Sequence, residues 1–454
     1  MSFRSINPYN GSTLQSVEPC SDTQLEHTLR RAAAVSPAWR EHSWEDRSRL
    51  LKAAAAVLRA RSEQLARLMS LEMGKLIKEA RGEIEKCAWA CEHYAEEGAR
   101  YLADEIIATD ASKSLIAYQP LGTVLAIMPW NFPFWQVFRF AAPALAAGNT
   151  ALLKHASNVP QCALAIEAVF VEAGFPAGVF QTLLIGADRV AAVIADPRVH
   201  AVTLTGSEAA GRQVAATAGA HLKKSVMELG GSDPFVVLED ADLDLAVQHA
   251  VTSRYLNAGQ SCIAAKRFVV LEAVADEFLA RFKTSVEALC PGDPLDERTT
   301  LAPLARHDLR DELHHQVLDS LAQGAAAEAG CRPVTGPGAF YEASILCNVR
   351  PGVRAYHEEL FGPVAVMLRA QDDADALRLA NDTRFGLGGS VWSTDAARAE
   401  RLARQMICGC AFVNGMVKSD PRLPFGGVRD SGYGRELSRL GIREFVNAKT
   451  LWVR

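Results

Sequence analysis

Hydrophobic positions repeat at helical spacing in the first quarter of the chain. Between residues 43 and 102, apolar side chains return every three or four positions, as at Leu50, Leu51, Ala54, Val57 and Leu58. This spacing places them on one face of a helix. Ser43 followed by Asp46 resembles a capping box at a helix start. We therefore predict that residues 43–102 are mainly helical.

The pattern changes to strand-like runs after residue 113. Ser114–Tyr118 and Thr123–Ile127 are short and apolar, and residues 119–122 between them contain a proline and a glycine. Two such runs joined by a turn signal are typical of a β-hairpin. We expect a hairpin near residues 114–127.

Strand-like and helical segments then alternate in two series. The strand-like runs of the first series are Thr150–Leu153, Phe180–Leu184, Ala201–Leu204 and Pro234–Leu238. Those of the second series are Phe268–Leu271, Val364–Leu368 and Gly389–Trp392. Strands that alternate with helices form parallel sheets covered by helices. The predicted fold class is α/β, with two α/β halves in one chain.

Length and composition narrow the possible functions. The chain has 454 residues, 49% of them hydrophobic and 22% charged, which is typical of a globular protein of two or three domains. The net charge of −5 and the lack of a long basic run give no sign of a nucleic-acid or membrane partner. Residues 1–8 do not resemble a signal peptide, and residues 124–153, the most apolar region, are interrupted by prolines and polar residues. We expect a cytoplasmic protein.

The ten cysteines are scattered along the chain, so we expect reduced thiols rather than a disulfide framework. Cys408 and Cys410 lack a nearby pair of histidines or cysteines, and no metal site is predicted. Cys262 follows Gly259-Gln260-Ser261 and is a candidate nucleophile. The alternative for Cys262 is a buried structural cysteine.

Glu228 ends an apolar run and precedes two glycines, so its carboxylate is a candidate general base. A solvated or capping carboxylate is the alternative. Asn131, within Pro129–Pro133, could donate to a developing oxyanion or make a local turn. Lys154 lies at the carboxyl end of a predicted strand, where ligands bind in α/β sheets, or is a surface lysine.

Thr205–Gly211 joins a predicted strand to a helix, where backbone N–H groups can bind phosphate. It is not a G-x-G-x-x-G fingerprint, and a plain turn is the alternative. Residues 358–363 and 424–427 are loop-like. Taken singly, none of these motifs decides the function.

Taken together and in this order, the motifs resemble the aldehyde dehydrogenase superfamily over nearly the whole chain. The matching segments are Pro129–Pro133, Lys154 and the residues after it, Thr205–Gly211, Met227–Gly231, Gly259–Cys262, Glu359–Pro363, Asn414, Pro424–Gly427 and Ser431–Glu436. The resemblance implies two Rossmann-like α/β domains with parallel sheets and a β element for oligomerisation. Residues 1–113 and 128–229 would form the cofactor-binding domain, 230–430 the catalytic domain, and 114–127 with 440–454 the bridging element.

The resemblance also implies roles for individual residues. Cys262 would attack the aldehyde carbon, Asn131 and the Cys262 N–H would hold the oxyanion, and Glu228 would activate the water that hydrolyses the thioester. The residues expected to contact the cofactor are Trp130, Lys154, Ser157, Gly206, Ser207, Leu229, Glu359 and Phe361. The cofactor would be NADP or NAD.

Ser157 departs from the pattern of NAD-preferring members, which usually have glutamate three residues after the lysine. A carboxylate there would repel a 2′-phosphate, whereas serine removes the repulsion and adds a donor. We therefore predict that NADP is favoured.

Arg139 shares a helix face with Phe132 and Gln136, and an arginine can bind a carboxylate with two hydrogen bonds. This resembles succinate-semialdehyde dehydrogenases, with Ser419 as a second contact. Leu256 stands where some of those enzymes carry a further arginine. Glutarate semialdehyde or a broader range of aldehydes remains open as substrate, and an internal salt bridge remains open for Arg139.

An exposed β element near both 114–127 and the C-terminus predicts a homodimer or homotetramer. Two alternatives belong to other classes: a non-catalytic structural relative of the crystallin type, and an enzyme that forms acyl-coenzyme A. The presence of Cys262, Glu228, Asn131 and Lys154 argues against the first, and Glu228 argues against the second.

Overall fold

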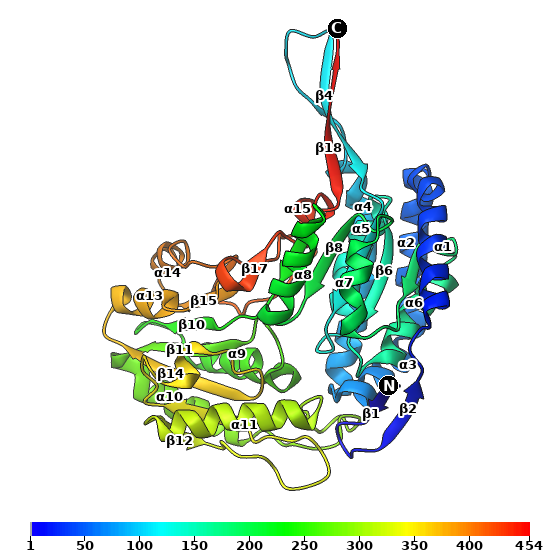
Figure 1. The fold of residues 1–454 in the computed structure, drawn as a ribbon. Helices are drawn as coiled ribbons and strands as arrows, with labels where there is room; N and C mark the ends of the chain where they lie inside the picture. Colours follow the sequence, from blue (N-terminus) through cyan, green and yellow to red (C-terminus); the bar gives the residue numbers. More distant parts are fainter. Residues whose placement is uncertain (1) are drawn as a thin grey trace.

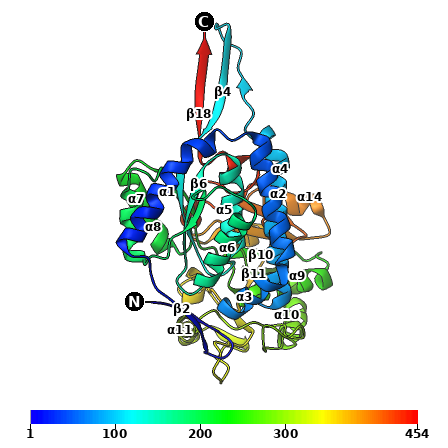
Figure 2. The same cartoon turned by 90° about the vertical axis from the view of Figure 1, so that its right-hand side faces the viewer.

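The computed structural model describes residues 2–454 and consists of two large sheets flanked by helices, with a narrow β arm that projects from the rest (Figures 1 and 2). The α/β fold class predicted from the sequence is confirmed. Among residues 2–454 no helix is both long and apolar enough to cross a membrane.

The first sheet has six strands, and all pairs but one are parallel. In spatial order they are β17 (Gly432–Tyr433), β9 (Lys224–Glu228), β8 (Ala201–Thr205), β5 (Thr123–Met128), β6 (Thr150–His155) and β7 (Phe180–Thr182). Only β17 is antiparallel to its neighbour, and it pairs Gly432 with Glu228. This late strand brings residues near the C-terminus beside the end of β9.

Helices cover both faces of the six-stranded sheet. They are α1 (Asp22–Arg40), α2 (Trp44–Ala60), α3 (Ser62–Met73), α4 (Ile77–Tyr101), α5 (Trp135–Ala146), α6 (Pro160–Glu172), η1 (Ala187–Arg189), α7 (Val190–Ala195) and α8 (Glu208–Ala220). Val124 and Ala126 pack with α2 to α6, whereas Leu125 between them packs with α1, α7 and α8. The sheet is therefore buried on both sides, as parallel sheets require.

The second sheet has seven strands, and only β12 is antiparallel to its neighbour. In spatial order they are β12 (Ala326–Ala329), β13 (Ser344–Cys347), β14 (Val364–Ala370), β11 (Ala265–Leu271), β10 (Asp233–Val237), β15 (Gly388–Trp392) and β16 (Cys410–Val413). Its helices are α9 (Leu243–Tyr255), η2 (Leu256–Gly259), α10 (Glu272–Glu287), α11 (His307–Ala322), α12 (Arg354–His357), α13 (Asp373–Asn381) and α14 (Ala396–Ala403).

The remaining elements are short or belong to the arm. They are β1 (Phe3–Ile6), β2 (Thr13–Val17), β3 (Glu105–Ile106), β4 (Lys113–Pro120), η3 (Arg429–Ser431), α15 (Ser438–Ile442) and β18 (Val446–Val453). The arm is the three-stranded sheet of β18, β4 and β3. Figures 1 and 2 show β4 and β18 extending away from both large sheets.

The hairpin predicted for residues 114–127 is wrong. The first run, β4, pairs with the C-terminal strand β18 along its whole length, but the second run, β5, lies in the middle of the six-stranded sheet. The turn at Gly122, with a φ of 126°, takes the chain from one sheet into the other. The physical reason is burial: β5 is buried along nearly its whole length, which suits a central parallel strand rather than an arm.

Candidate active site

Cys262 lies in a constrained loop between η2 and β11. Asn257, Ala258 and Gly259 have φ values of 55°, 53° and 73°, in the left-handed region. A Cβ at Gly259 would collide with the carbonyl of Gly362, so this glycine allows two loops to pack rather than giving a substrate access to the thiol. Backbone in this region persists only where surrounding contacts hold it.

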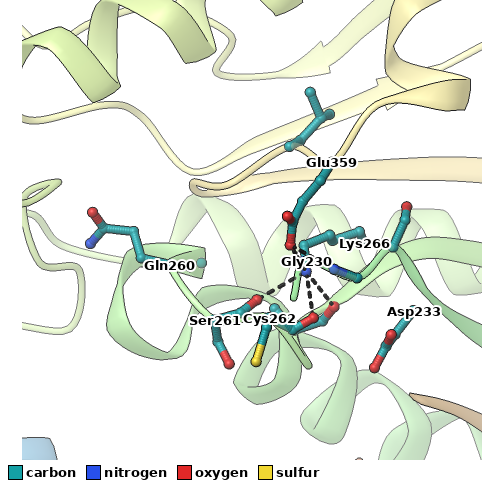
Figure 3. Close-up of polar contacts among 12 residues, drawn as sticks. Gly230, Asp233, Gln260, Ser261, Cys262, Lys266 and Glu359 are labelled. Atoms are coloured by element: carbon teal, nitrogen blue, oxygen red, sulfur yellow. Dashed lines mark hydrogen bonds and ion pairs between the residues drawn. The ribbon is translucent and has the colours of Figure 1, made fainter. Parts of the chain in front are cut away.

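Lys266 lies between the Cys262 loop and Glu359 and contacts both (Figure 3). Its buried Nζ donates to the carbonyl oxygens of Ser261 and Cys262, both at 2.9 Å, and forms an ion pair with Glu359 Oε1 at 3.0 Å. Glu359 also accepts from the Gly231 N–H at 3.1 Å. One ammonium group thus joins the nucleophile loop to the loop that follows α12.

Two cavities meet at Cys262. One, of about 310 Å³, is bounded by α4, α5 and the segment 416–419, and it contains Phe132, Arg139 and Ser419 in its wall. The other, of about 260 Å³, lies at the carboxyl ends of β5, β8 and β9. Cys262 and Gln136 line both. A molecule in each cavity would therefore reach the same sulfur.

The thiol of Cys262 is protonated at neutral pH in this arrangement. Burial raises the pKa of Cys262 to about 12, with Arg139 and Lys266 opposing the rise. Because the thiolate is the nucleophile, Cys262 needs a proton acceptor before it can attack.

Asn131 is placed beside the sulfur by its position just after β5. Its Nδ2 donates to the Gln260 carbonyl oxygen at 3.1 Å, and its backbone carbonyl accepts from Asn257 Nδ2 at 2.7 Å. An amide nitrogen has two protons, so one remains for another acceptor. Within residues 2–454 the Cys262 N–H also donates to no acceptor. These two donors are the pair an oxyanion hole needs.

Glu228 is the last residue of β9 and is buried away from both cavities. A Cβ on Gly426 would come within 2.7 Å of Glu228 Oε1, and this oxygen has no hydrogen-bond partner among the described residues. Burial raises the pKa of Glu228 well above its ordinary value, Arg139 opposes the rise, and Glu436 adds to it. Glu228 therefore has to turn, and lose its proton, before it can act on a water near Cys262.

Arg139 forms an ion pair with Glu436 in the interior, one of the two possibilities the sequence left open. The Arg139 side chain is 1% exposed, and its Nη2 donates to Thr205 Oγ1 at 3.2 Å. Its guanidinium also lies over the Phe425 ring, 4.6 Å from the centroid. The charge of Arg139 is thus balanced inside the protein. Its role as a substrate contact stays a prediction.

Six of the eight residues predicted to contact a cofactor line the second cavity. They are Trp130, Gly206, Ser207, Leu229, Glu359 and Phe361. The rings of Trp130 and Phe361 meet edge to face at 5.9 Å. A Cβ at Gly230 would collide with the Glu359 carboxylate, so glycine at this position lets that carboxylate reach the cavity.

Lys154 and Ser157 lie near the carboxyl end of β6, outside that lining. The Lys154 Nζ has no ion-pair or hydrogen-bond partner in the described chain, and burial lowers its pKa. Ser157 is exposed and has no acidic neighbour next to it in sequence. Ser207 caps the 13-residue helix α8, whose N-terminus favours negative charge. A cation without a partner, a helix start and a nearby hydroxyl fit a phosphate-bearing dinucleotide.

The sequence did not single out three buried groups of this region. Lys266 lies in β11, the central strand of its sheet, and Arg254 lies in the last turn of α9. Both are buried, where charged residues are rarely expected, and Arg254 Nη2 donates to the Leu360 carbonyl at 3.0 Å. Glu436 was noted only as part of a matching segment. One signal in the sequence could have identified Lys266. It lies with Arg267 inside an otherwise apolar run, Ala264-Ala265-Lys266-Arg267-Phe268.

Comparison with known proteins shows which family this site belongs to. The family model described as the aldehyde dehydrogenase family matches residues 1–451. The chain therefore belongs to the aldehyde dehydrogenase family, as the resemblance implied.

Individual relatives cover the full length. The chain is 51% identical over 453 residues to a probable succinate-semialdehyde dehydrogenase [NADP(+)] of a Synechocystis species, covering 100% of each. It is 49% identical to the succinate semialdehyde dehydrogenase [NAD(P)+] Sad of Escherichia coli, covering 99% of this chain and 97% of the relative. A crystal structure of succinic semialdehyde dehydrogenase from Streptococcus pyogenes with NADP+ is 37% identical, with a TM-score of 0.98 and 99% coverage of both chains.

Proposed function

We propose that this protein oxidises succinate semialdehyde to succinate with NADP+ as its favoured hydride acceptor and NAD+ as an alternative. The observation that carries the proposal is the position of Cys262, at the junction of a cavity for an aldehyde and a cavity for a dinucleotide. The names of the Synechocystis and E. coli relatives support the substrate, and the names of both, with the S. pyogenes structure, support the cofactor.

The chemistry begins when the Cys262 thiol loses its proton to solvent in the cavity and the thiolate sulfur attacks the aldehyde carbon. The carbonyl oxygen then becomes an oxyanion, and Asn131 Nδ2 and the Cys262 N–H are the two donors available to it. Lys266 helps to aim the N–H because it holds the Ser261 and Cys262 carbonyls at fixed positions. Preorganised donors of this kind lower the barrier by about 3 kcal/mol each.

The dinucleotide, when bound, supplies the acceptor for the hydride that leaves the former aldehyde carbon, so the adduct becomes a thioester on Cys262. Trp130, Gly206, Ser207, Leu229, Glu359 and Phe361 would hold it in the second cavity. Lys154 and Ser157 would bind its adenosine end. At position 157 a 2′-phosphate would meet a serine hydroxyl rather than a glutamate carboxylate, which supports NADP.

Hydrolysis of the thioester needs a base, and Glu228 is our assignment. Its carboxylate would take a proton from a water, the water oxygen would attack the thioester carbon, and Cys262 would leave with succinate released as the free acid. The two glycines after Glu228 give the backbone freedom at this point of the chain.

A steady-state assay tests the proposal. We expect succinate semialdehyde to have a kcat/KM at least about tenfold above that of butanal, and NADP+ a kcat/KM above that of NAD+. Glutarate semialdehyde belongs in the same panel, because it carries the same carboxylate one methylene further away. Cys262→Ala should abolish turnover with every aldehyde. Equal kcat/KM values for succinate semialdehyde and butanal would refute the substrate assignment.

We also infer that the protein forms a homodimer or homotetramer in the cytoplasm. The arm strand β18 exposes Leu451, Trp452 and Val453, at 41%, 50% and 52%. Exposed apolar residues on a long two-faced strand support pairing with a second copy. Light scattering of wild type and Trp452→Asp tests the assembly: a monomeric wild type would refute it.

A further inference from the structure

Lys86, on α4, stands in the aldehyde cavity with a charge that no carboxylate balances. Its Nζ donates to Ser419 Oγ at 2.7 Å and lies 4.3 Å from the centroid of the Trp135 ring. Lys86, Ser419 and Trp135 all line the cavity that holds Cys262. Among residues 2–454, no aspartate or glutamate forms an ion pair with Lys86.

Most of the other charged groups around Lys86 are paired elsewhere, and Glu79, which lines the same cavity, accepts from the Asn257 N–H at 3.1 Å. Arg139 pairs with Glu436, Glu83 pairs with Lys75, and Asp420 pairs with Arg422. Glu83 also accepts from the N–H groups of Phe134 and Trp135 at the start of α5. Of the two lysines in this wall that form no ion pair among the described residues, Lys86 is the half-buried one and Lys418 is exposed, so Lys86 is the cation whose charge is less screened by solvent and left for a ligand.

Ser419 supplies a second donor at the same place. Its Oγ accepts from Lys86 Nζ and from Trp135 Nε1, the latter at 3.1 Å. A hydroxyl has two acceptor sites, so both are used and its own proton must be donated. The described residues offer that proton no acceptor. The free protons of Lys86 and the hydroxyl proton of Ser419 thus converge on one point of the cavity wall.

We propose that Lys86, together with Ser419, binds the carboxylate at the far end of the semialdehyde, in place of Arg139. This inference deepens the proposed function and rests on it. A carboxylate is the ligand that uses one cation and one neutral donor at once, and such charge-assisted hydrogen bonds are the strong ones. Phe132, Phe425 and the thiol also line the cavity, which suits the methylene groups and the aldehyde end.

The titration of Lys86 agrees with this role. Burial and then the charge of Arg139 lower the pKa of Lys86 to about 8, while Cys87, Glu83 and Asp420 oppose the shift. A lysine without a bound anion therefore loses its proton above about pH 8. A bound carboxylate would favour the charged form, so carboxylate binding should weaken as the pH rises past that value.

The test compares Lys86→Met with Lys86→Arg and with Lys78→Met, which removes an exposed charge of the same helix outside the cavity. We expect Lys86→Met to lower the ratio of kcat/KM for succinate semialdehyde to that for butanal by about 10-fold to 100-fold, mainly through KM. Lys86→Arg should restore most of the ratio, and Lys78→Met should change it less than about threefold.

A binding measurement and a pH profile complete the test. Succinate, as an inhibitor competitive with the aldehyde, should bind more weakly to Lys86→Met by a similar factor. KM for succinate semialdehyde should rise above about pH 8 in the wild type and not in Lys86→Arg. If the wild type strongly prefers succinate semialdehyde over butanal in kcat/KM and Lys86→Met keeps the same preference, this inference alone is overturned. A wild-type ratio near one would overturn the proposed function and this inference with it.

Discussion

Lys266 and Glu359 form a salt bridge, with Nζ and Oε1 3.0 Å apart, directly behind the loop that presents Cys262. The same Nζ donates to the carbonyl oxygens of Ser261 and Cys262 (Figure 3). The pair therefore connects the nucleophile to the dinucleotide cavity, which Glu359 lines. Because Lys266 is 1% exposed, this connection is shielded from solvent and salt.

Replacement of Lys266 by methionine should disturb both ends of this connection. Two carbonyl oxygens and one carboxylate would lose a charged donor, and the Cys262 loop would shift. Since a displacement of about 1 Å can cost about 100-fold in rate, we expect kcat to fall by that order. Lys283→Met, which removes a half-exposed salt bridge to Glu328, is the matched control. Wild-type kcat in Lys266→Met would show that the lysine is not a positioning residue.

Glu228→Gln should separate the two halves of the reaction. If Glu228 is the base for thioester hydrolysis, the first turnover still forms NADPH, and then the enzyme stops with an acyl group on Cys262. We expect a rapid NADPH burst followed by a steady-state rate about 100-fold or more below wild type. Stopped-flow absorbance and intact-protein mass measure the burst and the acyl group. Loss of the burst itself would assign Glu228 to an earlier step. Glu342→Gln, on the surface, is the control.

Ser157→Glu should reverse the cofactor preference. A carboxylate at this exposed position would repel a 2′-phosphate and could bind ribose hydroxyls instead. We expect the ratio of kcat/KM for NADP+ to that for NAD+ to fall by about tenfold or more. Ser157→Ala, which removes the hydroxyl without adding charge, should change the ratio less. The assignment fails if Ser157→Glu leaves the ratio at its wild-type value.

Arg139→Met should destabilise the folded protein. It would leave Glu436 and Glu228 buried without the cation that now lowers the pKa of each carboxyl. Breaking a buried pair costs about 3–5 kcal/mol of unfolding free energy, whereas the exposed pair broken by Arg281→Met should cost less than about 1 kcal/mol. Urea unfolding measures both. In the double variant Arg139→Met/Glu436→Gln, the second change should restore part of the unfolding free energy lost by the first. If the losses of the two single variants simply add in the double variant, Arg139 and Glu436 do not form a direct pair.

The Cys262 thiol should react faster with iodoacetamide as the pH rises. Burial raises its pKa to about 12, so below that value the thiolate fraction increases about tenfold for each pH unit. We expect no plateau between pH 7 and pH 10 in the free enzyme. Peptide mass spectrometry of wild type and of Cys290→Ser, which lacks the exposed cysteine, identifies the reacting site. A plateau below pH 9 would show that a base near Cys262 already lowers its pKa.

Much of the fold follows from local pattern. The apolar runs that end near Met128, Lys154 and Thr205 were predicted as strands, the run that ends at Glu228 also forms one, and the four are neighbours in one parallel sheet. Carboxyl ends of parallel strands share one edge, so the residues that follow them gather there. Asn131, Gly206 and Ser207 come together for this reason. The family motifs then indicated which chemistry these side chains perform.

Other strands were not predicted, or were assigned to the wrong sheet, because their positions depend on segments that are distant in the sequence. β13 and β16 have only four residues each, too few for a clear alternation, and they form because neighbouring strands offer an open edge. The sequences of β4 and β5 both have the pattern of apolar strands, yet the two strands belong to different sheets. The partner of β4 is β18, at the other end of the chain, and no local signal indicates that pairing.

By itself, the sequence determined the α/β class and predicted a nucleophile and the kinds of side chain around it, because strand and helix periodicity and reactive residues are local properties. Tertiary structure alone decided which charges are already balanced. Arg139 was a candidate for a free carboxylate contact, but it pairs with Glu436 from the far end of the chain, while Lys86 donates to Ser419 and forms no ion pair within residues 2–454. Ion pairing depends on distances of a few ångströms and on burial, and both are set only when distant segments pack together.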